Sequence, residues 1–148
     1  MASVPDPRSL KQAIRKQAEA NRQAQPDKDQ ASRIIWQRFT ALPEYAAPGT
    51  VMLYVHTGDE VRTQPFLAQV IGHAERVVVP YCADDRLELF CLESPEELEP
   101  GAWGILEPRV VLRAAPGKRV SPEDVDLAMV PGVAFDRRGA RLGYGKGY

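Results

Sequence analysis

Residues 139–148 of this 148-residue chain carry the clearest chemical signal, because three glycines there alternate with Tyr144 and Lys146 and follow Arg141. Glycine has no Cβ, so it allows positive φ angles and a close approach of a ligand to the backbone. Alternating glycines can gather several backbone N–H groups into a concavity that binds anions. Arg141 and Lys146 would add full positive charge. The pattern predicts a loop for a polyanion such as the phosphates of a nucleotide.

A flexible terminal segment is the alternative interpretation of the same glycines. Against it, residues 130–136 resemble the exit of a buried strand. Open α/β sheets bind ligands in loops beyond the carboxyl ends of strands. Neither standard phosphate motif fits, because Gly147 follows Lys146 where a P-loop needs Ser or Thr. Tyr148 occupies the position of the third glycine in the dinucleotide fingerprint.

A helix predicted over residues 10–23, with Ser9 as its N-cap, places Lys11 and Arg15 four residues apart on one face. The two cations form either a solvated basic stripe or a pair that reaches a bound phosphate. A second helix is predicted over residues 29–39.

Residues 50–55 form a continuous apolar run, which indicates a strand buried on both faces. The polar loop that follows holds His56, which is either structural or catalytic, and Glu60, which follows a glycine turn and faces the same sheet edge as the glycine loop. A helix over 63–72 and a strand over 76–80 complete a βαβ unit.

The rest of the chain adds two predicted strands. Alternation over residues 87–92 predicts a half-exposed edge strand, and residues 126–132 predict a buried strand that leads to the glycine loop. Ser94 caps a short helix between them, and residues 100–120 are expected to be irregular. We therefore expect one α/β domain over residues 1–148, with a mostly parallel sheet.

The composition argues against several classes of protein, namely nucleic-acid binders, disulfide-rich or zinc-binding proteins and membrane-spanning proteins. Apolar residues make up 44% of the chain, and 19 basic against 20 acidic residues give a net charge of −1, which argues against a nucleic-acid partner. Cys82 and Cys91 match neither a disulfide framework nor a zinc site, and we assign no metal ligand. No apolar run approaches the roughly 18 residues of a membrane span. With no secretory signal, we expect a cytoplasmic protein without a membrane partner.

The chain resembles the 5-formyltetrahydrofolate cyclo-ligase family, also called methenyltetrahydrofolate synthetase. Its residues 131–148 follow the family pattern PG-x-x-FD-x-x-G-x-RLG-x-GKGYYD until the chain stops. Weaker matches come in family order upstream, at Lys11, Arg15, residues 59–63, 79–80, 93–95 and 104–108.

The resemblance implies an α/β three-layer sandwich and a ligase that converts 5-formyltetrahydrofolate to 5,10-methenyltetrahydrofolate with ATP and Mg²⁺. It implies that Lys11 and Arg15 contact ATP, that Val55 and Glu60 contact folate, and that Arg141 and Lys146 stabilise the transferring phosphoryl group. The residues implied to wrap the triphosphate are Arg141, Leu142, Gly143, Tyr144, Gly145, Lys146, Gly147 and Tyr148. Of these, Tyr144, Gly145, Lys146, Gly147 and Tyr148 would also face the folate.

The family motif continues with a second tyrosine and a magnesium-binding aspartate, whereas this sequence stops at Tyr148. The sequence is therefore expected to be either a fragment of a longer member of the family or a C-terminally truncated relative. We also expect a monomer. The alternative is a non-catalytic relative that binds nucleotide or folate without turnover.

Overall fold

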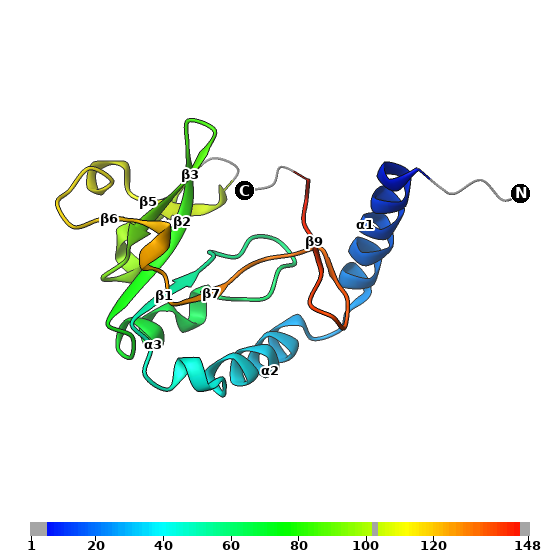
Figure 1. Cartoon of the computed structure of the whole chain (residues 1–148), viewed down its shortest axis with the longest axis horizontal. Coiled ribbons are helices and arrows are strands. Elements are labelled where there is room, and N and C mark those ends of the chain that lie inside the picture. The colour runs from blue at the N-terminus through cyan, green and yellow to red at the C-terminus, as the bar shows by residue number, and fades with distance from the viewer. Residues whose placement is uncertain (1–5, 102–103, 146–148) are drawn as a thin grey trace, which may run out of the picture.

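The computed structural model describes residues 6–101 and 104–145 and is built on a five-stranded sheet of order β6-β3-β2-β1-β7 (Figure 1). Strand β1 pairs in parallel with both β2 and β7, whereas β3 is antiparallel to β2 and β6. All of these strands except β3 therefore run in one direction, which confirms the expected α/β class with a mostly parallel sheet. The strand bounds are β1 Thr50–Leu53, β2 Arg76–Ala83, β3 Arg86–Cys91, β6 Arg119–Val120 and β7 Leu127–Met129.

The crossover between β1 and β2 confirms the predicted βαβ unit. The predicted helix over 63–72 forms in two parts, a 3₁₀ turn η2 (Gln64–Phe66) and the helix α3 (Leu67–Ile71). The turn includes Pro65, which suits the start of a helix because its missing N–H has no intrahelical partner there.

The main core lies on the sheet face covered by α2 (Lys28–Thr40), the 3₁₀ turn η1 (Pro43–Tyr45) and α3. Trp36 of α2 stacks on Phe66 with ring centroids 4.5 Å apart, and it is 5% exposed. The opposite face carries a smaller cluster of Val78, Leu89 and Val120, as expected from the alternation of side chains along strands.

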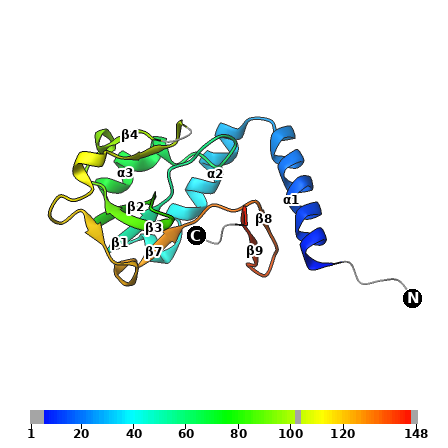
Figure 2. The same cartoon turned by 90° about the horizontal axis from the view of Figure 1, so that it is seen from above.

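Helix α1 (Pro7–Ala24) stands away from the sheet and lies beside the hairpin of strands β8 (Ala134–Phe135) and β9 (Arg141–Leu142) (Figure 2). None of its residues is buried. The predicted cap was wrong: Asp6 is the N-cap, and its side chain accepts a hydrogen bond from the Ser9 backbone N–H. Pro7 takes the first helical position, which moves the helix start upstream of Ser9.

Two strand predictions were wrong about position in the sheet. Strand β3 is not an edge, because β6 pairs along its outer side and leaves Phe90 only 1% exposed. Strand β7, predicted to be buried, lies at one edge of the sheet, and its residues alternate between half-buried and exposed. Propensity alone does not say which strand receives an outer neighbour.

The segment expected to be irregular contains further short elements. Strands β4 and β5 pair with each other as a separate two-stranded sheet. Their bounds and those of the nearby 3₁₀ turns are β4 Leu98–Pro100, β5 Leu106–Pro108, η3 Pro95–Glu97, η5 Val110–Leu112 and η6 Pro122–Asp124.

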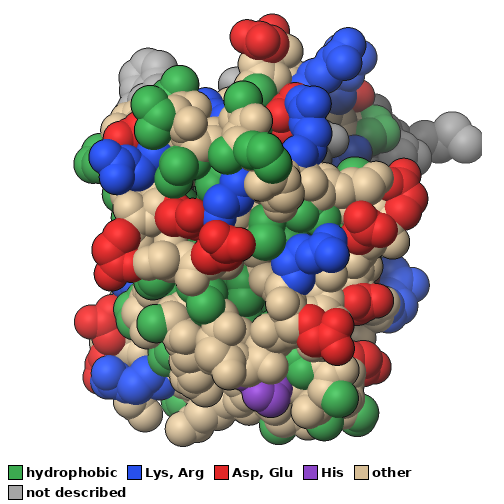
Figure 3. Space-filling model, turned by 90° about the vertical axis from the view of Figure 1, so that its left-hand side faces the viewer, with side chains coloured by type: hydrophobic (Ala, Val, Ile, Leu, Met, Phe, Trp, Pro, Cys, Tyr) green, Lys and Arg blue, Asp and Glu red, His purple; other side chains and the backbone are tan. Residues whose placement is uncertain are grey.

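Surface charge is mixed. Figure 3 shows acidic and basic side chains interspersed across one face of the molecule, in keeping with the near-balanced formal charge of −1. No helix in the described part of the chain is long and apolar enough to cross a membrane.

Candidate functional site

Two arginines of α1 hold the β8–β9 hairpin at both of its ends. The Arg15 Nε donates a hydrogen bond to the carbonyl oxygen of Gly143 at 2.9 Å, just after β9. The Arg22 Nη2 donates to the carbonyl oxygen of Gly132 at 2.6 Å, just before β8, and its Nη1 donates to the Tyr144 hydroxyl at 3.2 Å. Helix α1 therefore braces the segment that the sequence marked as a phosphate loop.

Helical geometry explains why these arginines act together. Arg15 and Arg22 are seven residues apart, close to two turns, so both face the hairpin. Lys11 lies one turn before Arg15 and is exposed. The sequence analysis identified Lys11 and Arg15 and missed Arg22, although the seven-residue spacing was a signal for it.

The hairpin replaces the first part of the predicted glycine loop. Asp136 closes its turn, because one carboxylate oxygen accepts hydrogen bonds from the backbone N–H groups of Arg138 and Ala140, both at 2.8 Å. These bonds lower the pKa of Asp136, with the Ala140 N–H contributing most. Gly139 takes a φ of 86° in the same turn, which favours glycine.

The predicted site residues of this segment fall in different places. Arg141 is exposed and donates to the carbonyl oxygen of Pro131 at 2.9 Å, and Leu142 pairs with Ala134 in the hairpin. Gly145 has a φ of 111°, and a Cβ built on it would lie 3.6 Å from the Arg15 guanidinium. Lys146, Gly147 and Tyr148 lie outside the described residues.

The loop after β1 holds Glu60 in a closed turn. The Thr57 N–H donates to Glu60 Oε2 at 2.9 Å, and the Glu60 N–H donates back to the Thr57 carbonyl oxygen at 3.1 Å. Gly58 in this turn has a φ of 53°. The Tyr54 hydroxyl donates to the Val61 carbonyl oxygen at 2.9 Å and fixes the next residue. One carboxylate oxygen of Glu60 is thereby oriented by the loop itself.

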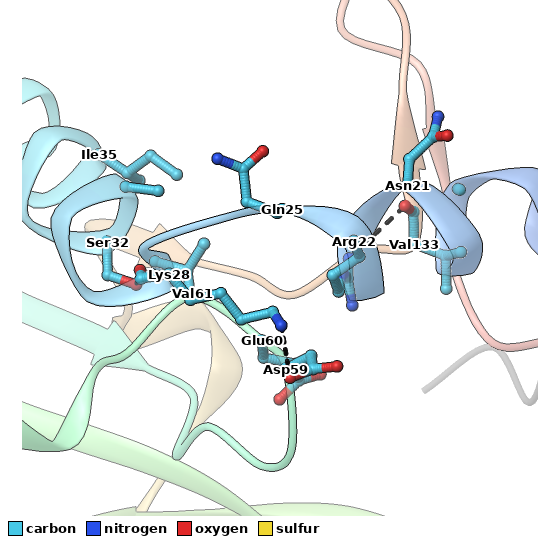
Figure 4. Close-up of a pocket in the computed structure, with 12 residues that line it drawn as sticks. Asn21, Arg22, Gln25, Lys28, Ser32, Ile35, Asp59, Glu60, Val61 and Val133 are labelled. Carbon is cyan, nitrogen blue, oxygen red and sulfur yellow. Dashed lines mark hydrogen bonds and ion pairs between the residues drawn. The ribbon is translucent and has the colours of Figure 1, made fainter.

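A pocket of about 370 Å³ lies between α1, α2 and this loop (Figure 4). Lys28 forms an ion pair with Asp59 at 3.3 Å, and Arg22 and Glu60 also line the cavity. Among the described residues, neither Arg22 nor Glu60 has an ion-pair partner. The lining residues are Ala18, Asn21, Arg22, Gln25, Lys28, Ala31, Ser32, Ile35, Asp59, Glu60, Val61 and Val133.

Tyr54 lies close enough to Glu60 and Arg22 for both charges to affect its pKa. Burial raises the pKa of Tyr54 well above its ordinary value, Glu60 raises it further, and Arg22 opposes the shift. The hydroxyl therefore stays protonated and remains a donor to Val61.

Val55 and His56 make contacts within the protein, and the contact of Val55 with folate stays a prediction. Val55 packs against the main core and is not among the residues that line the cavity. The His56 Nδ1 accepts hydrogen bonds from the backbone N–H groups of Thr63 at 3.1 Å and Gln64 at 3.3 Å. Burial lowers the pKa of His56, and Arg62 lowers it further. A neutral imidazole that holds the start of η2 matches the structural interpretation.

A protein-family comparison matches residues 7–148 to the 5-formyltetrahydrofolate cyclo-ligase family. The chain belongs to this family. Among the cyclo-ligases of known sequence, the probable 5-formyltetrahydrofolate cyclo-ligase of Schizosaccharomyces pombe is 36% identical over 124 residues. The 5-formyltetrahydrofolate cyclo-ligase of Mus musculus is 26% identical over 122 residues.

Solved structures of the family agree with the fold. The 5,10-methenyltetrahydrofolate synthetase of Aquifex aeolicus is 35% identical and superposes with a TM-score of 0.79. The superposition covers 94% of this chain and 69% of the Aquifex aeolicus chain. The 5,10-methenyltetrahydrofolate synthetase of Mycoplasma pneumoniae is 24% identical and superposes with a TM-score of 0.66, over 93% of this chain and 73% of its chain. At this identity the likeness supports the fold alone.

The match covers most of this chain and only part of its relatives. The aligned region spans 81% of this chain and 59% of the Schizosaccharomyces pombe cyclo-ligase. For the mouse cyclo-ligase it spans 79% of this chain and 59% of the mouse protein.

Proposed function

We propose that this chain takes part in the ATP-dependent cyclisation of 5-formyltetrahydrofolate to 5,10-methenyltetrahydrofolate, with release of ADP and phosphate. The observation that supports it best is the bond from Arg15 to Gly143, which brings the basic face of α1 to the glycine segment. The same helix borders the pocket that contains Glu60. Cations proposed for a triphosphate thus lie on a helix that borders the same pocket as the carboxylate proposed for a folate.

ATP would lie along α1 and the glycine segment. Lys11 and Arg15 would contact it from the helix, and residues 141–148 would wrap the triphosphate. Arginine and lysine side chains with backbone N–H groups stabilise the charge that spreads over a transferring phosphoryl group. Glu60 would bind the N–H donors of the folate ring in a charge-assisted pair.

Activation of the formyl group explains the need for ATP. Nitrogen donates into the formyl carbonyl and makes it a poor electrophile. Transfer of the γ-phosphoryl group breaks its bond to ADP and forms a bond to the formyl oxygen. The folate N10 then attacks the formyl carbon and loses its proton, and the C–O bond breaks as phosphate leaves. In this scheme Arg141 and Lys146 offset phosphate charge, and the protein mainly positions the two substrates.

In this proposal Mg²⁺ would be bound by the phosphates of ATP. The described residues contain no group of three Asp, Glu, His or Cys side chains that could hold a metal ion. Magnesium is commonly bound by substrate phosphates with few protein ligands. We assign no step to it. The cytoplasmic location and the monomeric state also stay predictions.

Product absorbance tests the proposal directly. We expect the chain to form 5,10-methenyltetrahydrofolate when 5-formyltetrahydrofolate, ATP and Mg²⁺ are all present, and to lose turnover in Lys146→Ala. Substrate binding without turnover would instead support the non-catalytic alternative. Failure to bind either substrate would refute both functions.

A further inference from the structure

We propose that Arg22 is a specificity-determining residue that, together with Glu60, recognises the 2-amino-4-oxo edge of the pterin ring. This inference rests on the proposed function, because it places the folate ring in the pocket between α1, α2 and the loop after β1. Glu60 would accept from the ring N–H donors, and Arg22 would donate to the neighbouring ring carbonyl.

The charge of Arg22 is uncompensated within the described part of the chain. Its side chain donates to three neutral acceptors, which are the Gly132 carbonyl, the Tyr144 hydroxyl and, at 3.5 Å, the Val133 carbonyl, and no described carboxylate is within ion-pair distance. A guanidinium has five N–H donors, so these three contacts, made by Nη1 and Nη2, leave the Nε–H and one more donor for a ligand. Lys28, the other cation of the pocket, is already paired with Asp59 at 3.3 Å.

Glu60 offers the complementary group. Its Oε2 accepts from the Thr57 N–H, and a carboxylate has further lone pairs for a ligand. Arg22 and Glu60 line the same cavity without pairing with each other. Figure 4 shows Arg22 on α1 to one side of Asp59 and Glu60, with its guanidinium bonded to the Val133 carbonyl oxygen. The cavity therefore presents donors from one wall and an acceptor from another.

A 2-amino-4-oxo ring matches this arrangement. Its amino group and ring N–H are adjacent donors, and the carbonyl beside them is an acceptor, so one edge can meet both side chains. Apolar side chains between the charged groups suit a flat ring, and they come from Ala18, Ile35, Val61 and Val133. Ligand pockets of this kind combine apolar walls with a few placed polar groups.

The test compares the binding of 5-formyltetrahydrofolate with that of its 4-amino analogue, in which an amino donor replaces the ring carbonyl and the adjacent ring nitrogen loses its hydrogen. The second change affects Glu60 equally in every Arg22 variant, so a change in preference between variants reports Arg22. Dissociation constants are measured by calorimetry for the wild type, Arg22→Met and Arg22→Lys. Lys16→Met is the matched control, because it removes a cation from an exposed position of the same helix. The ratio of the two constants on one protein does not depend on the fraction of that protein that is folded.

We expect Arg22→Met to reduce the preference for the 4-oxo compound by about tenfold, the effect of one charged hydrogen bond. Arg22→Lys should keep part of the preference, and Lys16→Met should keep all of it. Equal weakening of both ligands by Arg22→Met would show that Arg22 only braces the hairpin, and would overturn this inference while leaving the proposed function intact. Binding of neither ligand by the wild type would refute the folate site and this inference together.

Discussion

Arg15 donates through Nε to the carbonyl oxygen of Gly143 at 2.9 Å, across 128 residues of sequence. The bond comes from a helix that has no buried residue of its own. Helix α1 is therefore positioned by its polar contacts with the hairpin segment, and the hairpin segment by α1. Any ligand held by the glycines should be sensitive to this bond.

Replacing Arg15 with Met should weaken ATP binding by about tenfold or more, because a charged hydrogen bond contributes about 1.5–3 kcal/mol. Arg15→Lys should recover only part of the affinity, since an ammonium lacks the fixed Nε geometry. The KM for ATP measures the effect, and amide hydrogen exchange at Gly143 reports loosening of the loop. Lys16→Met serves as the control on α1. An unchanged KM in Arg15→Met would separate this helix from the nucleotide.

Glu60→Gln should raise the KM for 5-formyltetrahydrofolate by about tenfold while leaving the KM for ATP close to wild type. The amide oxygen of Gln can still accept from the Thr57 N–H, so the loop keeps its turn and loses only the charge. Asp59→Asn is the neighbouring control, because Asp59 is paired with Lys28. If Asp59→Asn had the larger effect on folate, the ligand contact would belong to Asp59.

Local patterns predicted the parts of the fold that depend on local order. The apolar run from Thr50 and the strand from Arg76 follow from β-branched residues in sequence. The position of β3 inside the sheet could not be predicted from local patterns. Its outer neighbour β6 is only two residues long, and so short a strand carries too little signal to be recognised in the sequence.

The candidate site divides in the same way. Residue types and spacing pointed to Lys11, Arg15 and Glu60. The spacing of Arg22 from Arg15 put both on one helix face, but its partner Gly132, 110 residues away, could not be read from the sequence. The hairpin was missed because its strands are two residues long and its turn depends on the Asp136 side chain. Such contacts are tertiary, and no local propensity encodes them.

Acidification should destabilise the protein partly through His56. Burial and Arg62 lower the pKa of His56 in the folded protein. In the unfolded chain the imidazole keeps its ordinary pKa of about 6.5, so the unfolded chain binds the proton more readily as the pH falls below that value. The free energy of unfolding should therefore fall as the pH decreases through about 6.5, and this contribution should level off below the folded pKa.

His56→Asn isolates that contribution, because an amide oxygen can accept from Thr63 without titrating in this range. Urea unfolding at about pH 8 and about pH 5 should show a smaller loss of stability for the variant than for the wild type. The same loss in both proteins would assign the pH dependence to other groups.

Lys118 should be the most sensitive ion-pair residue for stability. Its side chain is 9% exposed and donates to Glu93 at 2.9 Å and to Glu97 at 2.5 Å. Burial alone would lower the pKa of Lys118, but the hydrogen bonds to Glu97 and Glu93 outweigh it and raise the pKa. Glu97 is itself 16% exposed, so Lys118→Met leaves a poorly solvated carboxylate without its partner.

We therefore expect Lys118→Met to lower the free energy of unfolding by about 3 kcal/mol, measured by urea unfolding. Arg119→Met is the matched control, since the adjacent Arg119 is 74% exposed and pairs with Glu88 at the surface. Arg119→Met should lower the free energy of unfolding by less than about 1 kcal/mol. The double variant Lys118→Met with Glu97→Gln should recover part of the loss, because no uncompensated carboxylate remains at position 97. If the double variant were no more stable than Lys118→Met alone, the loss would come from other contacts of the lysine, such as that with Phe90, whose ring centroid lies 5.2 Å from Nζ.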